Sequence, residues 1–93
     1  MRVTPDIVQR ELIGLDAKVV RSSHPGYVGI AGRVLDETRN TVIILHENKK
    51  KIILKSTAVF HFTMPDGTIV EIDGKTIIGR PEDRIKKRVR RRW

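Results

Sequence analysis

The sequence predicts a mainly β protein: a small, strongly bent antiparallel barrel of five or six strands, preceded and followed by one helix. Three observations support this prediction. Short β-branched segments follow one another closely, no helical pattern separates them, and glycines interrupt one of them where a strand can bend. The 93 residues make one domain, and closing a small sheet on itself removes its exposed edges. We place the barrel at about residues 15–79 and the helices at about residues 5–13 and 81–92.

The first helix is indicated by the residues at its start. Thr4–Asp6 provides a capping side chain, a proline suited to the first helical position and an acid that complements the helix dipole. Ile7, Val8 and Leu12 form an apolar stripe, and Gly14 is suited to the end of the helix. Because so short a helix is not stable alone, it must dock on another surface.

Strand patterns dominate the middle of the chain. The predicted strands cover residues 17–21, 27–35, 41–45, 51–55, 58–63 and 69–73. Turns are expected at Asn48–Lys50 and at Met64–Thr68, which contains a Pro-Asp-Gly sequence. Gly29 and Gly32, within the second strand, are positions where the strand can bend sharply or take a bulge.

The C-terminus is strongly basic. Arg84 to Arg92 contains seven cations, and the whole chain has 19 Lys and Arg against 11 Asp and Glu, a net charge of +8. Arg80–Asp83 is a suitable helix start, and Ile85, Val89 and Trp93 then recur every four residues. We therefore expect an amphipathic helix whose remaining surface is cationic; a disordered solubility tail is the alternative.

Composition excludes several classes of protein. The chain has no cysteine, which excludes disulfides and cysteine-based zinc sites and favours a reducing compartment. It shows neither the apolar region of a signal peptide nor a run long enough to span a bilayer. We expect a soluble cytoplasmic protein whose basic character points to a polyanion, with nucleic acid ahead of a membrane surface.

No catalytic or metal site is expected. His24, His46 and His61 lack metal-type spacing, and Asp36 and Glu37 are adjacent, so that in a strand they point to opposite faces. A turn position is the simpler interpretation of that acidic pair. The chain contains no phosphate-binding glycine loop and no nucleophile motif.

Nucleic-acid binding has more support. Lys49, Lys50 and Lys51 lie at a predicted hairpin, and Lys55 ends the same predicted strand. A solvated turn is the alternative for the triplet. Small β-barrels with basic loops are more typical of RNA and single-strand binders than of proteins that read a DNA groove. With four aromatic residues in the chain, base stacking of the kind used for sequence-specific recognition is not expected.

Three segments, Arg10–Gly14, Val28–Thr41 and Gly79–Lys87, together resemble archaeal ribonuclease P protein component 1, the Sm-like protein subunit of that ribozyme. The resemblance covers nearly the whole chain, and the segments are specific in combination. Leu54-Lys55-Ser56, at the end of the fourth predicted strand, departs from the Pro-Lys pair that the resemblance leads us to expect there.

The resemblance implies an Sm-like barrel that is not itself the catalyst. The RNA subunit would cleave the 5′ leader of precursor tRNA with bound magnesium, and this chain would bind no cofactor, contact precursor tRNA indirectly and be a monomer when isolated. Its partners would be the ribonuclease P RNA and a zinc-ribbon protein subunit. The expected protein-partner residues are Ile7, Val8, Leu12 and Ile30, and docking of the first helix on its own barrel is the alternative. The candidate RNA-binding residues are Arg33, Lys49, Lys50, Lys51, Lys55, Arg80, Arg84, Lys86, Lys87, Arg88, Arg90, Arg91 and Arg92.

Three other functions remain open from the residues alone. A free-standing Sm-like RNA chaperone would form a ring through exposed strand edges. A peptide-binding barrel of the SH3 or tudor kind would need a groove of several aromatic side chains, which the composition disfavours. A small hydrolase would need a nucleophile and a base, for which we find no pattern.

Overall fold

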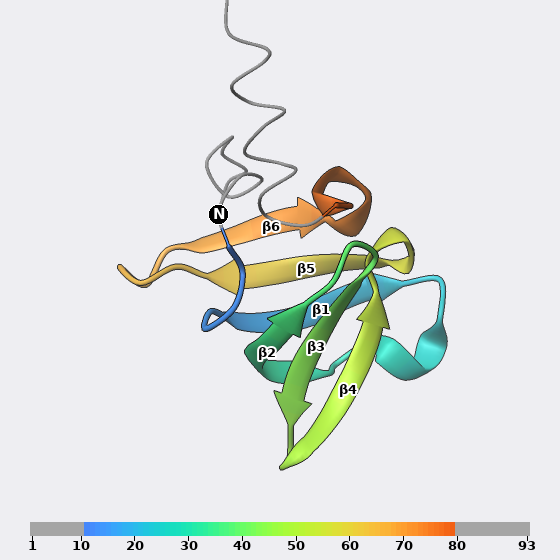
Figure 1. Ribbon diagram of the computed structural model, residues 1–93, viewed down its shortest axis with the longest axis horizontal. Helices are drawn as coiled ribbons and strands as arrows, with labels where there is room; N and C mark the ends of the chain where they lie inside the picture. The colour runs from blue at the N-terminus through green and yellow to red at the C-terminus, as the bar shows by residue number, and fades with distance from the viewer. Residues whose placement is uncertain (1–10, 80–93) are drawn as a thin grey trace, which may run out of the picture.

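The computed structural model describes residues 11–79, which form one antiparallel sheet of six strands and three short 3-10 helices (Figure 1). The strands are β1 (Asp16–Ser22), β2 (Ala31–Glu37), β3 (Thr41–His46), β4 (Lys49–Leu54), β5 (Ala58–Thr63) and β6 (Ile69–Asp73). The 3-10 helices are η1 (Pro25–Tyr27), η2 (Lys55–Thr57) and η3 (Gly74–Ile77). The strand order is β4-β3-β2-β1-β5-β6.

The sheet is sharply bent. In Figure 1, β1, β5 and β6 run across the view, whereas β3 and β4 lie at a steep angle to them. The pairing register shifts at Val20, between β1 and β5, and at Leu35, between β2 and β3. Such bulges bend a strand and increase its twist. Gly32 also contributes, because a Cβ atom there would lie 1.8 Å from the Leu45 carbonyl oxygen; only glycine allows β2 and β3 to approach so closely.

The concave side of the sheet holds the core. β5 alternates between its two faces, with Ala58, Phe60 and Phe62 buried and the residues between them half-buried. The two phenylalanine rings stack at 5.4 Å inside a cluster that is otherwise mainly aliphatic. That cluster comprises Leu12, Leu15, Ala17, Val19, Ile30, Val34, Val42, Ile44, Ile53, Ala58, Phe60, Phe62, Val70, Ile72 and Ile77.

A closed barrel is not confirmed. In the described part of the chain, β4 and β6 are the two edges of an open sheet and do not pair with each other. The segments that follow them do meet, because η3 packs on η2 so closely that a Cβ atom on Gly74 would lie 1.8 Å from the Lys55 carbonyl oxygen. The edges are therefore joined at one corner by backbone packing and not along their length.

Two predicted strand boundaries were wrong. The second strand begins at Ala31 instead of residue 27, because Pro25–Tyr27 forms η1. The β3–β4 hairpin turns at Glu47 and Asn48, which both have positive φ as a two-residue turn requires. The turn therefore ends before Lys49, so the lysine triplet belongs to β4.

The predicted terminal helices are not confirmed. Residues 5–10 and 81–92 lie outside the described part of the chain. Glu11–Ile13, the last part of the first predicted helix, is not helical. No helix within residues 11–79 has the length and apolar character needed to cross a membrane.

Leu12 should contribute to stability as a core residue. It is 0% exposed, and the turn it begins is held to β2 by the bond from the Gly14 amide to the Val34 carbonyl, 2.9 Å. We expect Leu12→Ala to lower the free energy of unfolding by about 2–5 kcal/mol, measured by chemical denaturation. Ile13→Ala is the matched control, because Ile13 is 41% exposed and its loss should change stability by about 0.5 kcal/mol or less. Equal losses would show that the turn does not pack as described.

Candidate nucleic-acid interface

The fold brings two candidate RNA-binding residues into one row on the convex face of the sheet. Arg33 on β2 pairs with Leu45 on β3, and Leu45 pairs with Lys50 on β4. Paired residues of adjacent strands point to the same face, and all three side chains are exposed. Asp16 on β1 lies on the other side of Arg33 in the same row. The row therefore combines two cations with one acid and an exposed leucine.

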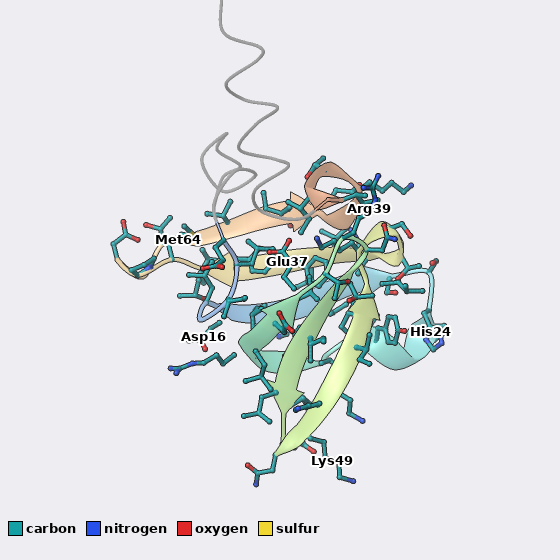
Figure 2. The ribbon with its side chains drawn as sticks, viewed as in Figure 1. Asp16, His24, Glu37, Arg39, Lys49 and Met64 are labelled. Atoms are coloured by element: carbon teal, nitrogen blue, oxygen red, sulfur yellow. The ribbon has the colours of Figure 1, made fainter. Side chains whose placement is uncertain are left out.

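The other two lysines of the triplet do not share that row. Lys51 pairs with the fully buried Ile44, so its side chain starts from the concave face, where it is half-buried. Lys49 is exposed at the hairpin end, which projects from the rest of the sheet (Figure 2). The triplet thus presents cations to both faces of the β3–β4 hairpin.

Lys55, a candidate RNA-binding residue, is buried in the described fold. Its side chain is 0% exposed, and its Nζ lies 2.6 Å from the Glu37 Oε2, whose side chain is also fully buried. The same nitrogen donates to the carbonyl oxygens of Thr38 at 2.8 Å and Gly79 at 3.0 Å, with that of Arg39 at 3.3 Å. A buried cation cannot reach a phosphate without leaving these partners.

Two expected protein-partner residues are also buried in the chain's own core. Leu12 is 0% exposed and Ile30 is 7% exposed, so the described fold leaves neither side chain for a second protein. The apolar side chain of Leu12 docks on its own sheet, which was the alternative for the short helix. Ile7 and Val8 lie outside the described residues.

Most of the excess charge is in the ends of the chain. Residues 11–79 contain nine Lys and Arg and eight Asp and Glu, so that the sheet is nearly neutral. The remaining candidate RNA-binding residues lie outside the described part of the chain: Arg80, Arg84, Lys86, Lys87, Arg88, Arg90, Arg91 and Arg92. Any strong attraction to a polyanion must come chiefly from these ends.

The convex face also carries a cluster of His61, Glu71 and Arg21. The His61 Nε2 lies 3.0 Å from one carboxylate oxygen of Glu71, and the Arg21 guanidinium lies 3.5 Å from the other. The hydrogen bond from His61 holds the pKa of the Glu71 carboxyl below its ordinary value, and the charge of Arg21 adds to this. His46, by contrast, pairs with the backbone: its Nδ1 lies 2.9 Å from the Ala31 carbonyl oxygen.

A hollow of about 520 Å³ opens beside this cluster. Its polar side chains are Asp16, Lys18, His61 and Thr63, and Ile69 also lines it. Residues 11–79 contain no group of three or more His, Cys, Asp or Glu that could hold a metal ion. The hollow therefore offers mixed charges on an open surface and no ligand set for a metal.

The aromatic residues within the described range do not form a peptide-binding groove. Phe60 and Phe62 are both 0% exposed. Tyr27 packs against the core and stacks on His24 with ring centroids 4.3 Å apart. An SH3 or tudor type of site needs several exposed aromatic side chains, so this arrangement disfavours that function.

Comparison with known proteins decides the family. Residues 5–87 match the family described as ribonuclease P/MRP, subunit p29. The chain belongs to this family. It is 52% identical to ribonuclease P protein component 1 of Pyrococcus furiosus over 86 residues, which cover 92% of this chain and 68% of that protein. It is 50% identical to the protein of the same name from Methanothermobacter thermautotrophicus, covering 96% of this chain and 98% of that one.

A solved structure agrees. Mth11, described as a homologue of the human RNase P protein Rpp29, is 49% identical to this chain and superposes with a TM-score of 0.60, covering 82% of this chain and 99% of Mth11. The resemblance drawn from Arg10–Gly14, Val28–Thr41 and Gly79–Lys87 is thus confirmed at the level of the p29 family.

The p29 chain contains one pair that sequence reasoning missed, Glu37 with Lys55. A signal for Lys55 was present, because strand alternation places it on the same side as the apolar Ile53. No such signal existed for Glu37. The bulge at Leu35 shifts the alternation of β2, so that Glu37 shares the buried side with Val34 and Asp36 is exposed. Only strand pairing reveals that shift.

We expect the pKa of the Glu71 carboxyl to depend on its hydrogen bond with His61. In His61→Ala the pKa of Glu71 should rise towards its ordinary value, as measured by NMR titration, because the largest cause of its lowering is removed. A carboxyl whose pKa is lowered by folding stabilises the protein above its unfolded pKa of about 4.3 and loses this contribution as the pH falls through the folded value. Glu71→Gln should therefore reduce the acid sensitivity of the unfolding midpoint below about pH 4.5.

The control is His24→Ala, which removes a histidine stacked on Tyr27 instead of bonded to Glu71. It should leave the titration of Glu71 unchanged. If the pKa of Glu71 is the same in His61→Ala as in the wild type, the hydrogen bond between His61 and Glu71 is contradicted.

Proposed function

We propose that this chain is a non-catalytic, RNA-binding protein subunit of ribonuclease P that supports the RNA subunit in 5′ maturation of precursor tRNA. Membership of the p29 family is the observation that carries the proposal. The charge distribution supports it, since a nearly neutral folded sheet is joined to a terminus rich in cations. Phosphate contacts of that kind dominate affinity for nucleic acid and position the protein without reading sequence.

The proposal extends to the other members of the complex. Magnesium would be held by the RNA, and a zinc-ribbon protein subunit would be the protein partner, in the cytoplasm. With Leu12 and Ile30 buried, Ile7 and Val8 are the remaining members of the expected partner surface. The closed Sm-like barrel and the terminal helices are part of the same proposal and would need the ends of the chain to complete them.

Identification of the RNA that co-purifies with the tagged protein tests this function directly. We expect one main species, a ribonuclease P RNA, and no cleavage of precursor tRNA by the refolded protein without RNA. A broad mixture of RNAs together with a ring-sized particle would favour the Sm-like chaperone. The described sheet has the two unpaired edge strands that such a ring would use, so particle size must be measured as well.

Salt dependence tests the contribution of the C-terminus. We define the neutralised variant as the full-length chain in which seven cations are replaced by Gln: Arg84, Lys86, Lys87, Arg88, Arg90, Arg91 and Arg92. If about four of these contact phosphate, the slope of log affinity against log salt should fall by about 3, measured with a transcript of archaeal ribonuclease P RNA. Affinity for transfer RNA should fall as well, since phosphate contacts do not specify sequence.

The matched single substitutions are Arg33→Gln and Lys50→Gln from the row on the convex face, and Arg21→Gln as the control. Each of the first two should lower the slope by about 0.7–0.9 if it contacts one phosphate. Arg21 is already paired with Glu71, so its replacement should change the slope least. An unchanged slope in the neutralised variant would show that the basic terminus serves solubility and not RNA binding.

A further inference from the structure

The presence of a buried ion pair between Lys55 and Glu37 is not explained by stability alone or by direct RNA contact. Both side chains are 0% exposed. A buried ion pair is often no more stabilising than apolar side chains of the same size, because desolvation opposes the attraction. Its hydrogen-bond partners indicate a more specific role.

The Lys55 ammonium joins segments that are distant in sequence. It has three N–H groups, and its short contacts are to Glu37, to the Thr38 carbonyl and to the Gly79 carbonyl. The first two belong to the end of β2 and the turn that follows. Gly79 lies 24 residues beyond Lys55 and directly precedes Arg80, where the basic C-terminal segment begins.

Gly79 is held from a second direction. Its amide donates to the Arg39 carbonyl at 2.7 Å, so both of its backbone polar groups are bound to this corner of the fold. Its φ of 111° lies in the region that favours glycine, and the residue is buried. Figure 2 shows Arg39 beside η3, at the opposite end of the sheet from Lys49.

We propose that Lys55 is a positioning residue for RNA binding: with Glu37 it holds Gly79 against the β2–β3 turn and so sets where the basic segment leaves the sheet. This inference rests on the proposed function, because it matters only if the cations after Gly79 contact RNA. Lys55 itself contacts no phosphate. It acts by reducing the number of backbone dihedrals that must be ordered when RNA binds.

Two variants release Gly79 in different ways. The double variant Glu37→Leu with Lys55→Met removes both charges at nearly constant volume and leaves the net charge unchanged. Gly79→Ala leaves the ion pair in place and disfavours the positive φ. Should the double variant fail to fold, Gly79→Ala decides by the RNA-binding outcomes given below. Ile53→Val is the control, a core change on β4 that lowers stability without touching the ion pair.

The first measurement is amide hydrogen exchange of the full-length chain. In the wild type the Gly79 amide should exchange slowly, since it is buried and bonded to Arg39. In the double variant it should exchange rapidly while the amides of β5 remain protected. Continued protection of Gly79 in that variant would overturn the proposal, because the glycine would then be held without Lys55.

The second measurement is binding to the ribonuclease P RNA transcript at several salt concentrations. Both Gly79-releasing variants should bind about tenfold more weakly than the wild type, as expected when about one further residue must be ordered. Their salt slope should be unchanged, because the same cations still reach phosphate. Ile53→Val should bind as the wild type does.

The same substitutions made in the neutralised variant complete the test. There they should have no effect, since no cations remain to be positioned. A loss of equal size in that background would mean a general structural effect and would overturn the proposal, as would unchanged affinity in the wild-type background. A slope lower by about 0.7–0.9 in the double variant would show that Lys55 contacts RNA after all. If the neutralised variant itself binds like the wild type, the proposed RNA contact of the C-terminus fails first, and the positioning role fails with it.

Discussion

The ammonium of Lys55 connects the corner where the two edges of the sheet come together. It lies between the end of β2, the turn after it and Gly79, and its backbone amide donates to Asn40 at 2.8 Å. η3 also packs against the backbone of Lys55, because Gly74 lies close to the Lys55 carbonyl group. An isolated buried charge would be destabilising by several kcal/mol, so Glu37 and the carbonyl groups are a requirement of this arrangement and not an addition to it. The corner of the open sheet depends on one side chain having all its partners in place.

The chain combines a nearly neutral folded sheet with a basic C-terminal segment. The sheet supplies the core, the bend and the fixed corner, and its convex face carries only a few cations, of which Arg33 and Lys50 share a row. The excess positive charge follows Gly79. Close cations repel one another within a compact fold, whereas on a segment that begins at a fixed point they can be directed at a polyanion. Gly79 is therefore the point at which the folded sheet is joined to the basic segment.

Much of the sheet could be predicted because its signals are local. The strand at residues 58–63 was predicted with its correct bounds, and its alternation separates Phe60 and Phe62, which lie in the core, from the half-buried residues between them. The hairpin turn was predicted at Asn48–Lys50 instead of at Glu47 and Asn48, because these two residues adopt positive φ without the glycine that usually marks such a turn. The second strand was predicted too long because Gly29 was interpreted as a bend within it, whereas Pro25–Tyr27 forms a 3-10 helix.

The sequence by itself determined the class of fold, most of the strands, the family and the concentration of charge at one end, because periodicity, composition and motif are properties of neighbouring residues. Only the tertiary structure decided which charges are available. Lys55 is buried because its partners come from positions 16 to 24 residues away, and Glu37 faces it because a bulge, which exists only in a paired strand, reverses the alternation after Leu35. Leu12 belongs to the core for the same reason: it is buried where the turn after it is hydrogen-bonded to β2, a pairing that no local pattern specifies.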